Sequence, residues 1–409
     1  MTVFTYAIYL YPMDFTLGSK TALLSLFFIQ GLLFAGLLLA KGLSYQHRPS
    51  YWLSTFLLLC CGYITPFMLG YSGWYGREGY ADFLFFVPFQ QLFFLGPVIY
   101  GYTRSLLGDD VRIRGKEWWH FLPGGLYLLY TIVIFVVDYW VLEEYYFYAD
   151  GRDKDLADWY QYSGLISVAV YSYFSLRRYN EYRKKIFEEL SYADTVVYAW
   201  VRQFLVVLLA ILLLRITFMI LLPNFGSFGA WFWYYIVFSM LFTFIGVAGY
   251  TNVVKTMAPL RWLREKVPAV EAVTPEPPAA ASGSELDLDN WKPRVEALIR
   301  EEKMYENPTL TLQDLAERLG VTTKQVSGII NQGFGMNFND FVNHHRVTAV
   351  LEKFDRGEHK KFTILSIALS CGFNSKTTFN RAFKRQMART PVQYLSEKEQ
   401  REAGTDPKR

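Results

Sequence analysis

The stretch Ile364-Leu-Ser-Ile-Ala-Leu-Ser-Cys-Gly-Phe-Asn-Ser-Lys-Thr-Thr-Phe-Asn-Arg-Ala-Phe-Lys-Arg385 predicts two short helices joined by a tight turn. Its first half is apolar at helical spacing, and Gly372 is the residue type that commonly ends a helix. Ser375 can then cap a second helix, in which Phe379 and Phe383 share one face. A helix, a turn and a second helix in this order are typical of proteins that read DNA.

The same arrangement occurs a second time, upstream in the chain. Residues 311–320 and 321–331 form another pair of short helical patterns, and the second helices of the two pairs begin 53 residues apart, at Thr322 and Ser375. The 17-residue helical pattern over 338–354 lies between them and would be about 26 Å long at ~1.5 Å per residue. Two reading helices at that separation can enter successive major grooves, which are about 34 Å apart.

Residues 309–395 resemble the DNA-binding domain of the AraC/XylS family of bacterial transcription regulators, over about a fifth of the chain. The resemblance is carried by Ile367-Ala368, Gly372-Phe373, Ser375, Phe379, Arg381-Ala-Phe-Lys384, Thr390-Pro391 and Tyr394. The sequence departs from the family at Met387-Ala388, where an aromatic residue and a glycine are usual. It departs again at Gly328, where the family often has a base-reading side chain.

Charge in this region agrees with DNA as the partner. Residues 318–391 contain 12 Lys and Arg but only 4 Asp and Glu, and such an excess binds phosphates by releasing counterions. By analogy with the family, we expect base contacts from Lys324, Ser327, Lys376, Thr377, Asn380 and Arg381. Asn331 also faces outward on the first reading helix, and Lys384, Arg385 and Arg389 are placed to meet phosphates. The plain alternative is a solvated basic surface without a ligand.

The N-terminal part of the chain has a different composition. Residues 1–254 contain 34 charged residues, whereas the much shorter segment 285–409 contains 37. With 52% hydrophobic residues overall, disorder is excluded for most of the chain. Seven stretches are long enough to cross a bilayer, which takes about 20 apolar residues. They are 21–40, 51–70, 83–102, 121–141, 159–176, 200–222 and 231–254.

The sequence therefore predicts an all-α protein, because a chain in hydrocarbon must satisfy its backbone polar groups internally. We expect a seven-helix transmembrane bundle over 1–254, a juxtamembrane segment and Pro/Ala-rich linker over 255–290, and a soluble domain with two helix-turn-helix units over 291–409. Basic residues number 15 in the loops on one side and 4 on the other. Since positive loops stay in the cytoplasm, the N-terminus is expected outside the cytoplasmic membrane of a bacterium and the C-terminal domain inside.

Two ionisable residues lie within predicted spans. Arg215 and Asp138 are both in the outer half of the bundle, and such groups are functional hypotheses by default. Arg215 is expected either to pair with Asp138 or to bind an anionic ligand, and the alternative is a purely structural pair or a snorkelling side chain. The cysteines and histidines are too few and scattered to indicate a metal site. We expect no cofactor, no metal and no catalytic site.

These observations favour a membrane-integrated transcription regulator, in which the bundle senses an unknown signal and the C-terminal domain binds promoter DNA. The partners would be double-stranded DNA, the lipid membrane and a signal ligand, and a homodimer remains open. One alternative is a membrane transporter or enzyme with an appended regulatory DNA-binding domain. Another is a tether that proteolysis cuts in the Pro/Ala-rich linker to release a soluble regulator.

Overall fold

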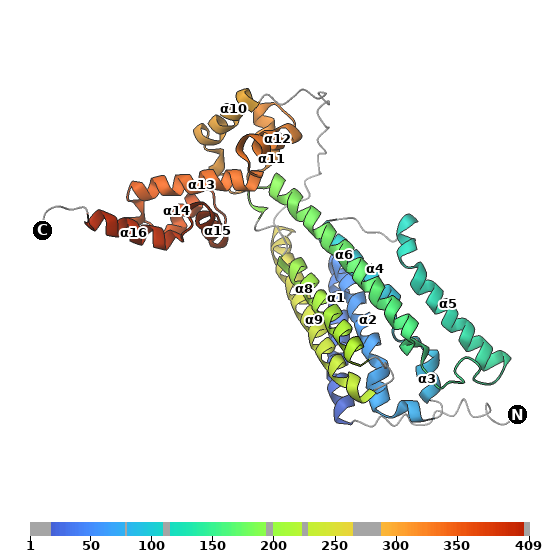
Figure 1. The fold of residues 1–409 in the computed structure, drawn as a ribbon. Coiled ribbons are helices and arrows are strands. Elements are labelled where there is room, and N and C mark those ends of the chain that lie inside the picture. Colours follow the sequence, from blue (N-terminus) through green and yellow to red (C-terminus); the bar gives the residue numbers. More distant parts are fainter. Residues whose placement is uncertain are drawn as a thin grey trace. The chain divides into compact units, whose positions relative to one another are not determined.

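The computed structural model describes residues 18–77, 80–108, 115–193, 199–222, 228–264 and 288–404. Within these ranges the regular secondary structure is helical, which confirms the predicted all-α class. The chain divides into two compact units (Figure 1): Met1–Tyr179 with Ala199–Glu271, and Asn180–Tyr198 with Ala272–Arg409. Residues 180–198 lie inside the predicted membrane domain 1–254, yet they group with the C-terminal unit.

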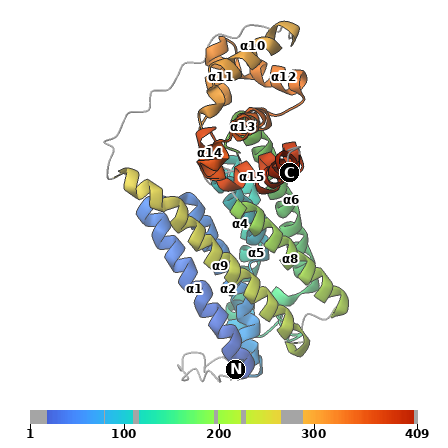
Figure 2. The same cartoon turned by 90° about the vertical axis from the view of Figure 1, so that its left-hand side faces the viewer.

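The first unit is a bundle of long helices. Its elements are α1 (Ser19–Tyr45), α2 (Arg48–Tyr71), α3 (Tyr80–Phe86), α4 (Leu92–Leu106), α5 (Leu122–Val136), the N-terminal part of α6 (Asp158–Glu189), α8 (Ala199–Leu221) and α9 (Phe228–Arg264). Short 3-10 turns join several of them, and a π-helical turn, Val137–Val141, extends α5. Figures 1 and 2 show α1, α2 and α9 running side by side.

Small residues permit this close packing of helices. A Cβ atom on Gly31 of α1 would lie 2.5 Å from Sγ of Cys61 on α2 and 2.9 Å from the Phe242 ring on α9. A Cβ on Gly249 of α9 would similarly lie 2.4 Å from the Leu53 side chain on α2. Glycine at these positions therefore lets three apolar helices approach as closely as membrane helices commonly do.

Five helical segments are long and apolar enough to span a membrane, judged within the described part of the chain. They are Ser19–Tyr45, Arg48–Tyr71, Leu122–Val141, Trp200–Leu221 and Gly229–Val254. The predicted number of seven spans is not confirmed. The fifth predicted span, 159–176, lies within α6, a 32-residue helix that is too polar to be counted among the five.

The third predicted span, 83–102, is wrong as a single helix, because the chain breaks between α3 and α4. Pro88 lies in the break, and a proline disfavours the helical conformation of the residue before it. The backbone N–H of Gln90 instead donates to Oδ2 of Asp155 at 2.8 Å, and the Gln90 amide donates to the carbonyl oxygen of Tyr63 at 3.0 Å. The first of these hydrogen bonds satisfies a backbone N–H that a continuous helix would otherwise have satisfied, and the second ties the break to α2.

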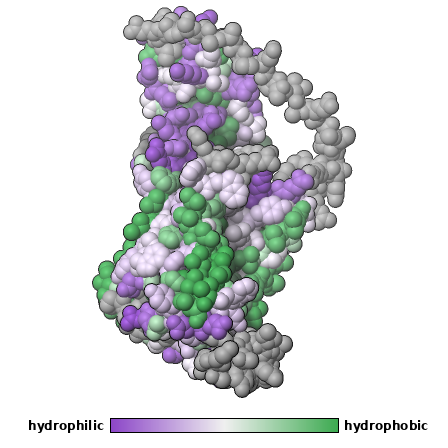
Figure 3. Space-filling view, turned by 90° about the vertical axis from the view of Figure 1, so that its right-hand side faces the viewer, coloured by the Kyte–Doolittle hydropathy of each residue, from purple (hydrophilic) through white to green (hydrophobic). Residues whose placement is uncertain are grey.

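The surface of the bundle is apolar. Large side chains such as Leu26, Ile29 and Ile220 are 65%, 63% and 75% exposed. Figure 3 shows hydrophobic residues gathered over the bundle, whereas hydrophilic residues predominate on the C-terminal unit. A contiguous apolar surface of this kind marks a protein or membrane contact.

The second unit consists of shorter helices. They are α10 (Leu288–Glu301), α11 (Leu312–Leu319), α12 (Thr323–Phe334), α13 (Phe338–Asp355), α14 (Ile364–Ser370), α15 (Lys376–Met387) and α16 (Pro391–Gly404). Figures 1 and 2 show α10, α11 and α12 on one side of α13, and α14, α15 and α16 on the other. The two predicted helix-turn-helix pairs are therefore confirmed as α11–α12 and α14–α15.

Two hydrophobic clusters hold this unit together, and α13 belongs to both. Phe338, Phe341 and Val342 from its first half pack into the cluster around α11 and α12. Residues from its second half, among them Val350 and Phe354, pack into the cluster around α14 and α15. Since one helix supplies a wall to each cluster, it acts as the strut that fixes the separation of the two helix-turn-helix units.

Candidate nucleic-acid interface and bundle cavity

The first helix-turn-helix pair is defined by its caps. Thr311 and Asp314 form a reciprocal capping box, with Asp314 N–H donating to Thr311 Oγ1 at 3.2 Å and Thr311 N–H to Asp314 Oδ2 at 2.8 Å. Gly320 ends α11 in the left-handed conformation, with φ of 69°. Thr322 and Gln325 then form a second capping box that starts α12. Satisfying the free N–H groups in this way fixes where each short helix begins.

The second pair uses simpler caps. Thr363 accepts from the backbone N–H of Ser366 at 3.1 Å, and Ser375 accepts from the N–H of Thr378 at 3.1 Å. Between the helices, Gly372 has φ of 88°, and a Cβ there would lie 2.1 Å from the carbonyl oxygen of Tyr305. Glycine is thus needed both for the turn and for the close approach of the neighbouring loop.

The residues predicted to contact DNA lie on two exposed helix faces. On α15 the exposed side chains are Lys376, Thr377, Asn380, Arg381, Lys384 and Arg385, and Arg389 is exposed just beyond the helix. On α12, Lys324 and Asn331 are exposed and Ser327 is half-buried. The fold therefore places every residue of the predicted set on or next to the second helix of its pair, where a helix-turn-helix domain meets the major groove.

Some of these side chains already have partners. Arg385 forms an ion pair with Asp340 of α13, and Arg389 forms one with Glu397 of α16. On α12 the Asn331 amide donates to Ser327 Oγ at 3.3 Å. An anion has to compete with a carboxylate for Arg385 and Arg389, whereas Lys376 and Lys384 form no such ion pair within the part of the chain that the structure describes.

Arg381 is in a strongly positive environment. Partial burial lowers the pKa of its guanidinium, and the nearby charges of Arg385 and Arg183 lower it further. An arginine nevertheless stays charged at neutral pH. An arginine guanidinium on an exposed helix face, with other positive charges nearby, can donate two hydrogen bonds to the O6 and N7 acceptors of guanine in the major groove.

One departure from the family pattern has a visible consequence. Ala388, which follows α15 where the family usually has glycine, adopts the left-handed conformation with φ of 58°. The turn into α16 is therefore kept, although an L-residue with a Cβ is strained in this region. The helix α15 itself is unaffected, since it begins after the predicted cap Ser375 and carries Phe379 and Phe383 on its buried face.

The bundle has its own polar site, centred on Arg215. The Arg215 guanidinium is almost fully buried and donates to Oε1 of Gln161 on α6. Its carbon atom Cζ lies 4.6 Å from the centroid of the Trp231 ring and 5.1 Å from that of Tyr234. Aromatic faces attract a cation through their quadrupole, and this attraction is largest where water is excluded.

A cavity within the first unit adjoins this arginine. It is partly open to the outside, and α2, α4, α6, α8 and α9 contribute to its wall. Arg215, Gln161 and the hydroxyl groups of Tyr63 and Tyr234 are its polar members, and the rest of the lining is almost entirely apolar. A cavity with an apolar body and a few converging polar groups is the usual form of a small-molecule site.

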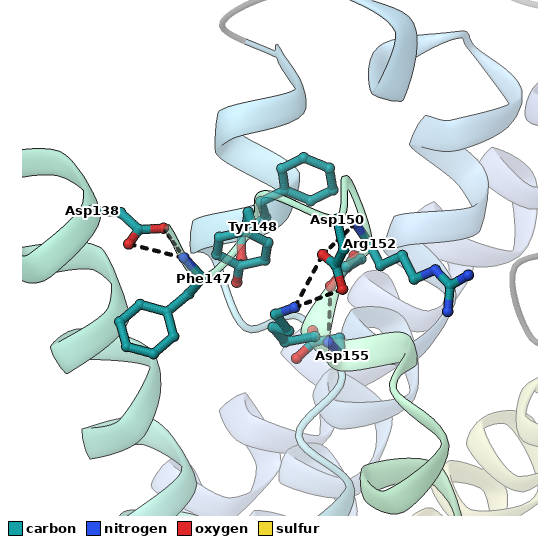
Figure 4. A network of polar contacts seen from close by, with 9 residues as sticks. Asp138, Phe147, Tyr148, Asp150, Arg152 and Asp155 are labelled. Atoms are coloured by element: carbon teal, nitrogen blue, oxygen red, sulfur yellow. Dashed lines mark hydrogen bonds and ion pairs between the residues drawn. The ribbon is translucent and has the colours of Figure 1, made fainter. Parts of the chain in front are cut away.

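Asp138, the other predicted membrane residue, is buried and accepts from the backbone N–H of Phe147 at 3.1 and 3.2 Å (Figure 4). The contacts described above for Arg215 are with Gln161 and aromatic rings. The predicted pairing of Arg215 with Asp138 therefore stays a prediction.

A pair of buried carboxylates was missed from the sequence. Asp155 accepts from Tyr127 Oη at 2.6 Å and from Gln90 N–H at 2.8 Å, and Asp153 accepts from Tyr75 Oη at 2.5 Å. Burial raises the pKa of both, that of Asp155 to about 6. The only signal was the acidity of this loop, which does not show which carboxylates are buried. Within the described ranges, no group of three or more His, Cys, Asp or Glu side chains could hold a metal ion.

Comparisons with known proteins agree with this geometry for the C-terminal unit. Residues 315–397 match a family model described as a helix-turn-helix domain. The probable transcription factor PqrA of Proteus vulgaris is 29% identical over 107 residues, which is 26% of this chain and 80% of that protein. No solved structure shows significant similarity to the chain. The C-terminal part of this protein is therefore a helix-turn-helix domain of the AraC type, joined to an N-terminal region of apolar helices.

Proposed function

We propose that this protein is a membrane-integrated transcription regulator that binds specific promoter DNA through both helix-turn-helix pairs. The observation that carries this proposal is the face of α15 on which Lys376, Asn380 and Arg381 are exposed together, on a capped helix. Arg and Asn can each form two hydrogen bonds with a base edge, to guanine and adenine respectively. Sequence discrimination therefore comes mainly from α15.

The other predicted residues have supporting roles. Lys384 binds phosphate directly, while Arg385 and Arg389 bind it after exchanging their carboxylate partners. On α12, Lys324, Ser327 and Asn331 contact the second groove segment with fewer charged groups. Since contacts to phosphate fix register and contacts to bases fix sequence, the first pair mainly positions the domain and the second pair mainly reads.

The bundle anchors the protein in the cytoplasmic membrane of a bacterium. Its five long apolar helices and its exposed hydrophobic side chains support this location. The excess of basic residues in alternate loops supports an N-terminus outside and a DNA-binding domain inside. A reporter enzyme that is active only outside the cytoplasm, fused at residue 150 and separately at the C-terminus, tests the orientation. Activity at the C-terminal fusion would overturn it.

Genome-wide mapping of the DNA bound by the full chain tests the central proposal. We expect discrete promoter peaks for the wild type and their loss in Arg381→Ala. The control is Lys361→Ala, which removes an exposed basic residue outside both reading helices. If Arg381→Ala keeps the wild-type binding profile, α15 does not read sequence as proposed.

The cavity beside Arg215 is the proposed signal site. Its chemistry fits a molecule with an apolar body and an anionic head, because the apolar wall ends at a buried guanidinium and an amide. A ligand there shifts the protein between states only if it binds one state better. In this proposal the positive charge of Arg215 binds the anionic head of the ligand, and the size of the side chain is not what matters.

Dodecanoate is a suitable probe, with dodecanol as the matched molecule that lacks the charge. For the full chain in lipid nanodiscs, we expect dodecanoate to raise the unfolding temperature more than dodecanol does. The difference should vanish in Arg215→Leu and persist in Arg202→Leu, which changes an exposed arginine on the same helix. If dodecanoate stabilises the wild type and Arg215→Leu equally, Arg215 does not bind the anionic head and the proposed site is wrong.

A further inference from the structure

The segment that follows α6 is built into the DNA-binding unit. Leu190 pairs with Thr311 as an isolated antiparallel bridge, and the backbone N–H of Ser191 donates to the carbonyl oxygen of Leu310 at 3.1 Å. Ser191 and Ala193 are completely buried. These residues belong to the second compact unit, although they precede α8 of the bundle in the sequence.

Two side chains of α13 hold this segment. The Asn339 amide donates to the carbonyl oxygens of Leu190 and Ser191, at 3.3 and 2.8 Å. Arg346 donates through Nη1 to the Ser191 carbonyl at 3.3 Å and through Nη2 to Ser191 Oγ at 3.1 Å. Together with the bond to Leu310, all three polar groups of Ser191 are thus bonded within the DNA-binding unit.

Arg346 connects the same segment to the junction of the two helix-turn-helix pairs. Its guanidinium also donates to the carbonyl oxygens of Tyr305 and Asn307, at 2.8 and 2.7 Å. Tyr305 packs against both hydrophobic clusters, and its carbonyl lies directly against the turn at Gly372. One arginine, which is only 1% exposed, thus bonds at once to Ser191 and to the loop between the two clusters.

Such a contact is more than surface packing. A buried guanidinium is tolerated only where acceptors replace its lost hydration. Ser191 provides two of these acceptors, so undocking the segment removes hydrogen bonds from a charge at the centre of the domain. The arrangement of the loop at Tyr305 and of α13 therefore depends on whether the segment is in place.

A positive charge on α6 also links the segment to the DNA-reading helix α15. Arg183, which precedes the segment on α6, is near enough to Arg381 to contribute to lowering its pKa, after partial burial and Arg385. A docked segment therefore also brings a further cation to the DNA-reading face.

We propose that residues 190–193 are a control element which, when docked at Arg346 and Asn339, holds the two helix-turn-helix pairs in the one arrangement that fits successive grooves. The inference rests on the proposed function, since it concerns control of that DNA-binding surface. Both neighbours of the segment in the chain, α6 and α8, contribute to the wall of the cavity at Arg215. A change in the bundle then reaches the DNA-binding domain through residues 190–193, without proteolytic release and without passing through 265–287.

The docked form binds DNA more tightly because its two reading helices are already fixed relative to one another. Two reading helices that are already fixed relative to one another lose less freedom on binding DNA than two that move independently. Undocking should therefore weaken binding and leave the individual base contacts chemically intact.

The test uses the full chain in lipid nanodiscs and a promoter fragment identified by the genome-wide mapping above. Ser191→Pro removes the N–H and the hydroxyl group of the segment and leaves residues 288–404 unchanged. Ser191→Ala is the matched milder variant, because it loses only the hydroxyl group. Asn339→Leu leaves the segment itself unchanged and removes the α13 amide that donates to the carbonyl oxygens of Leu190 and Ser191.

Hydrogen–deuterium exchange reports docking, and a binding titration reports its effect. We expect slow exchange at the Ser191 amide in the wild type, fast exchange over 190–193 in Asn339→Leu, and unchanged protection in α15. Affinity for the promoter fragment should fall about tenfold in Ser191→Pro and in Asn339→Leu, which corresponds to about 1.4 kcal/mol, and about twofold to threefold in Ser191→Ala.

Three outcomes overturn the inference. They are fast exchange at Ser191 in the wild type, wild-type affinity in both Ser191→Pro and Asn339→Leu, and a rise in affinity when the segment is released. Arg381→Ala on the same fragment separates this result from the proposed function. If Arg381→Ala loses binding while the undocking variants keep it, only the control element fails. If Arg381→Ala also binds as the wild type does, the proposed function fails.

Discussion

The two units of this protein place their charges in opposite ways. In the bundle, Arg215, Asp138, Asp153 and Asp155 are buried, while large apolar side chains are exposed. In the C-terminal unit, apolar residues form two buried clusters and the basic side chains of α12 and α15 are exposed. A group that works on a ligand inside the protein must be buried, whereas a group that works on DNA must be accessible.

The contrast also separates the effects expected from mutation. Changing a buried charge alters stability and its dependence on pH, because desolvation differs between the folded and unfolded states. Changing an exposed charge leaves stability almost unaltered and acts on the bound partner. Among the described residues of the C-terminal unit, Arg346 departs from this pattern, since its guanidinium is buried, and it is there that the segment 190–193 attaches.

The largest effect is expected from Asp155→Asn, which sharpens the contrast on the side of the bundle. Burial raises the pKa of Asp155 from 3.8 to about 6, so the folded protein binds this proton more tightly than the unfolded chain. Protonated Asp155 therefore adds to the free energy of unfolding. This contribution is fully present below pH 4 and is lost as the pH rises through about 6, by an amount on the order of 3 kcal/mol. Thermal unfolding of the full chain between pH 4 and pH 7.5 measures it.

In Asp155→Asn the decline in stability with rising pH should become shallower. Asp153, whose pKa burial also raises, supplies the part that remains. The titratable groups nearby include Tyr75, Tyr127, Tyr148, Tyr160 and Lys154. Asp150→Asn, in the same loop but exposed, is the control and should leave the decline unchanged. An unaltered pH profile in Asp155→Asn would show that Asp155 is not the group that titrates.

The next largest effect is expected from Arg381→Ala, which changes an exposed charge of the C-terminal unit. Loss of a bidentate base contact should reduce discrimination for the preferred promoter fragment by about 1–3 kcal/mol. The free energy of unfolding should change by less than about 0.5 kcal/mol, since the side chain is exposed. Competition binding against fragments with single base changes measures the first, and denaturant titration the second. A large loss of stability would break the contrast.

Lys384→Ala should have a smaller and more uniform effect. The lysine meets phosphate in our proposal, so affinity should fall by a similar factor, about fivefold, on every DNA sequence. The slope of log affinity against log salt should decrease by about 1. A titration series at four salt concentrations, with Arg381→Ala in parallel, distinguishes the two roles. Sequence-dependent losses in Lys384→Ala would place it among the base contacts instead.

The smallest effect is expected from Ala388→Gly. Glycine adopts the left-handed conformation without the steric penalty of a Cβ, so the variant should stabilise the C-terminal unit by about 0.5 kcal/mol. Hydrogen exchange of α15 and α16 amides in the full chain reports the change, and Ala382→Gly, within α15, is a control that should destabilise. Reduced protection in Ala388→Gly would show that the turn before α16 is not strained.

The C-terminal unit was predictable because its information is local. Capping residues such as Thr311, Thr322 and Ser375 mark helix starts, and apolar spacing marks the inward face of each helix. The bundle was less predictable. Hydropathy averages over a window, so it could not show that Pro88 and the bond from Gln90 to Asp155 break the third span.

The candidate sites divide in the same way. The exposure of Lys376, Asn380 and Arg381 follows from their position on one amphipathic helix. By contrast, Gln161 and Arg215 meet across 54 residues, and Ser191 meets Arg346 across 155. The buried position of Arg346 within an apolar helical stripe was a sequence signal that it needed acceptors, but that signal does not name them.

The sequence by itself determined the all-α class, the paired helix-turn-helix units and the exposed basic face that we propose meets DNA, because helix periodicity, caps and exposed charge depend on residues a few positions apart. Only the tertiary structure decided where buried charges find their hydrogen-bond partners: Arg215 in the bundle, Asp155 at the break before α4, and Arg346 at Ser191. Burying a charge requires partners, and those partners come from whichever segments the fold brings together, at distances along the chain that no local pattern encodes.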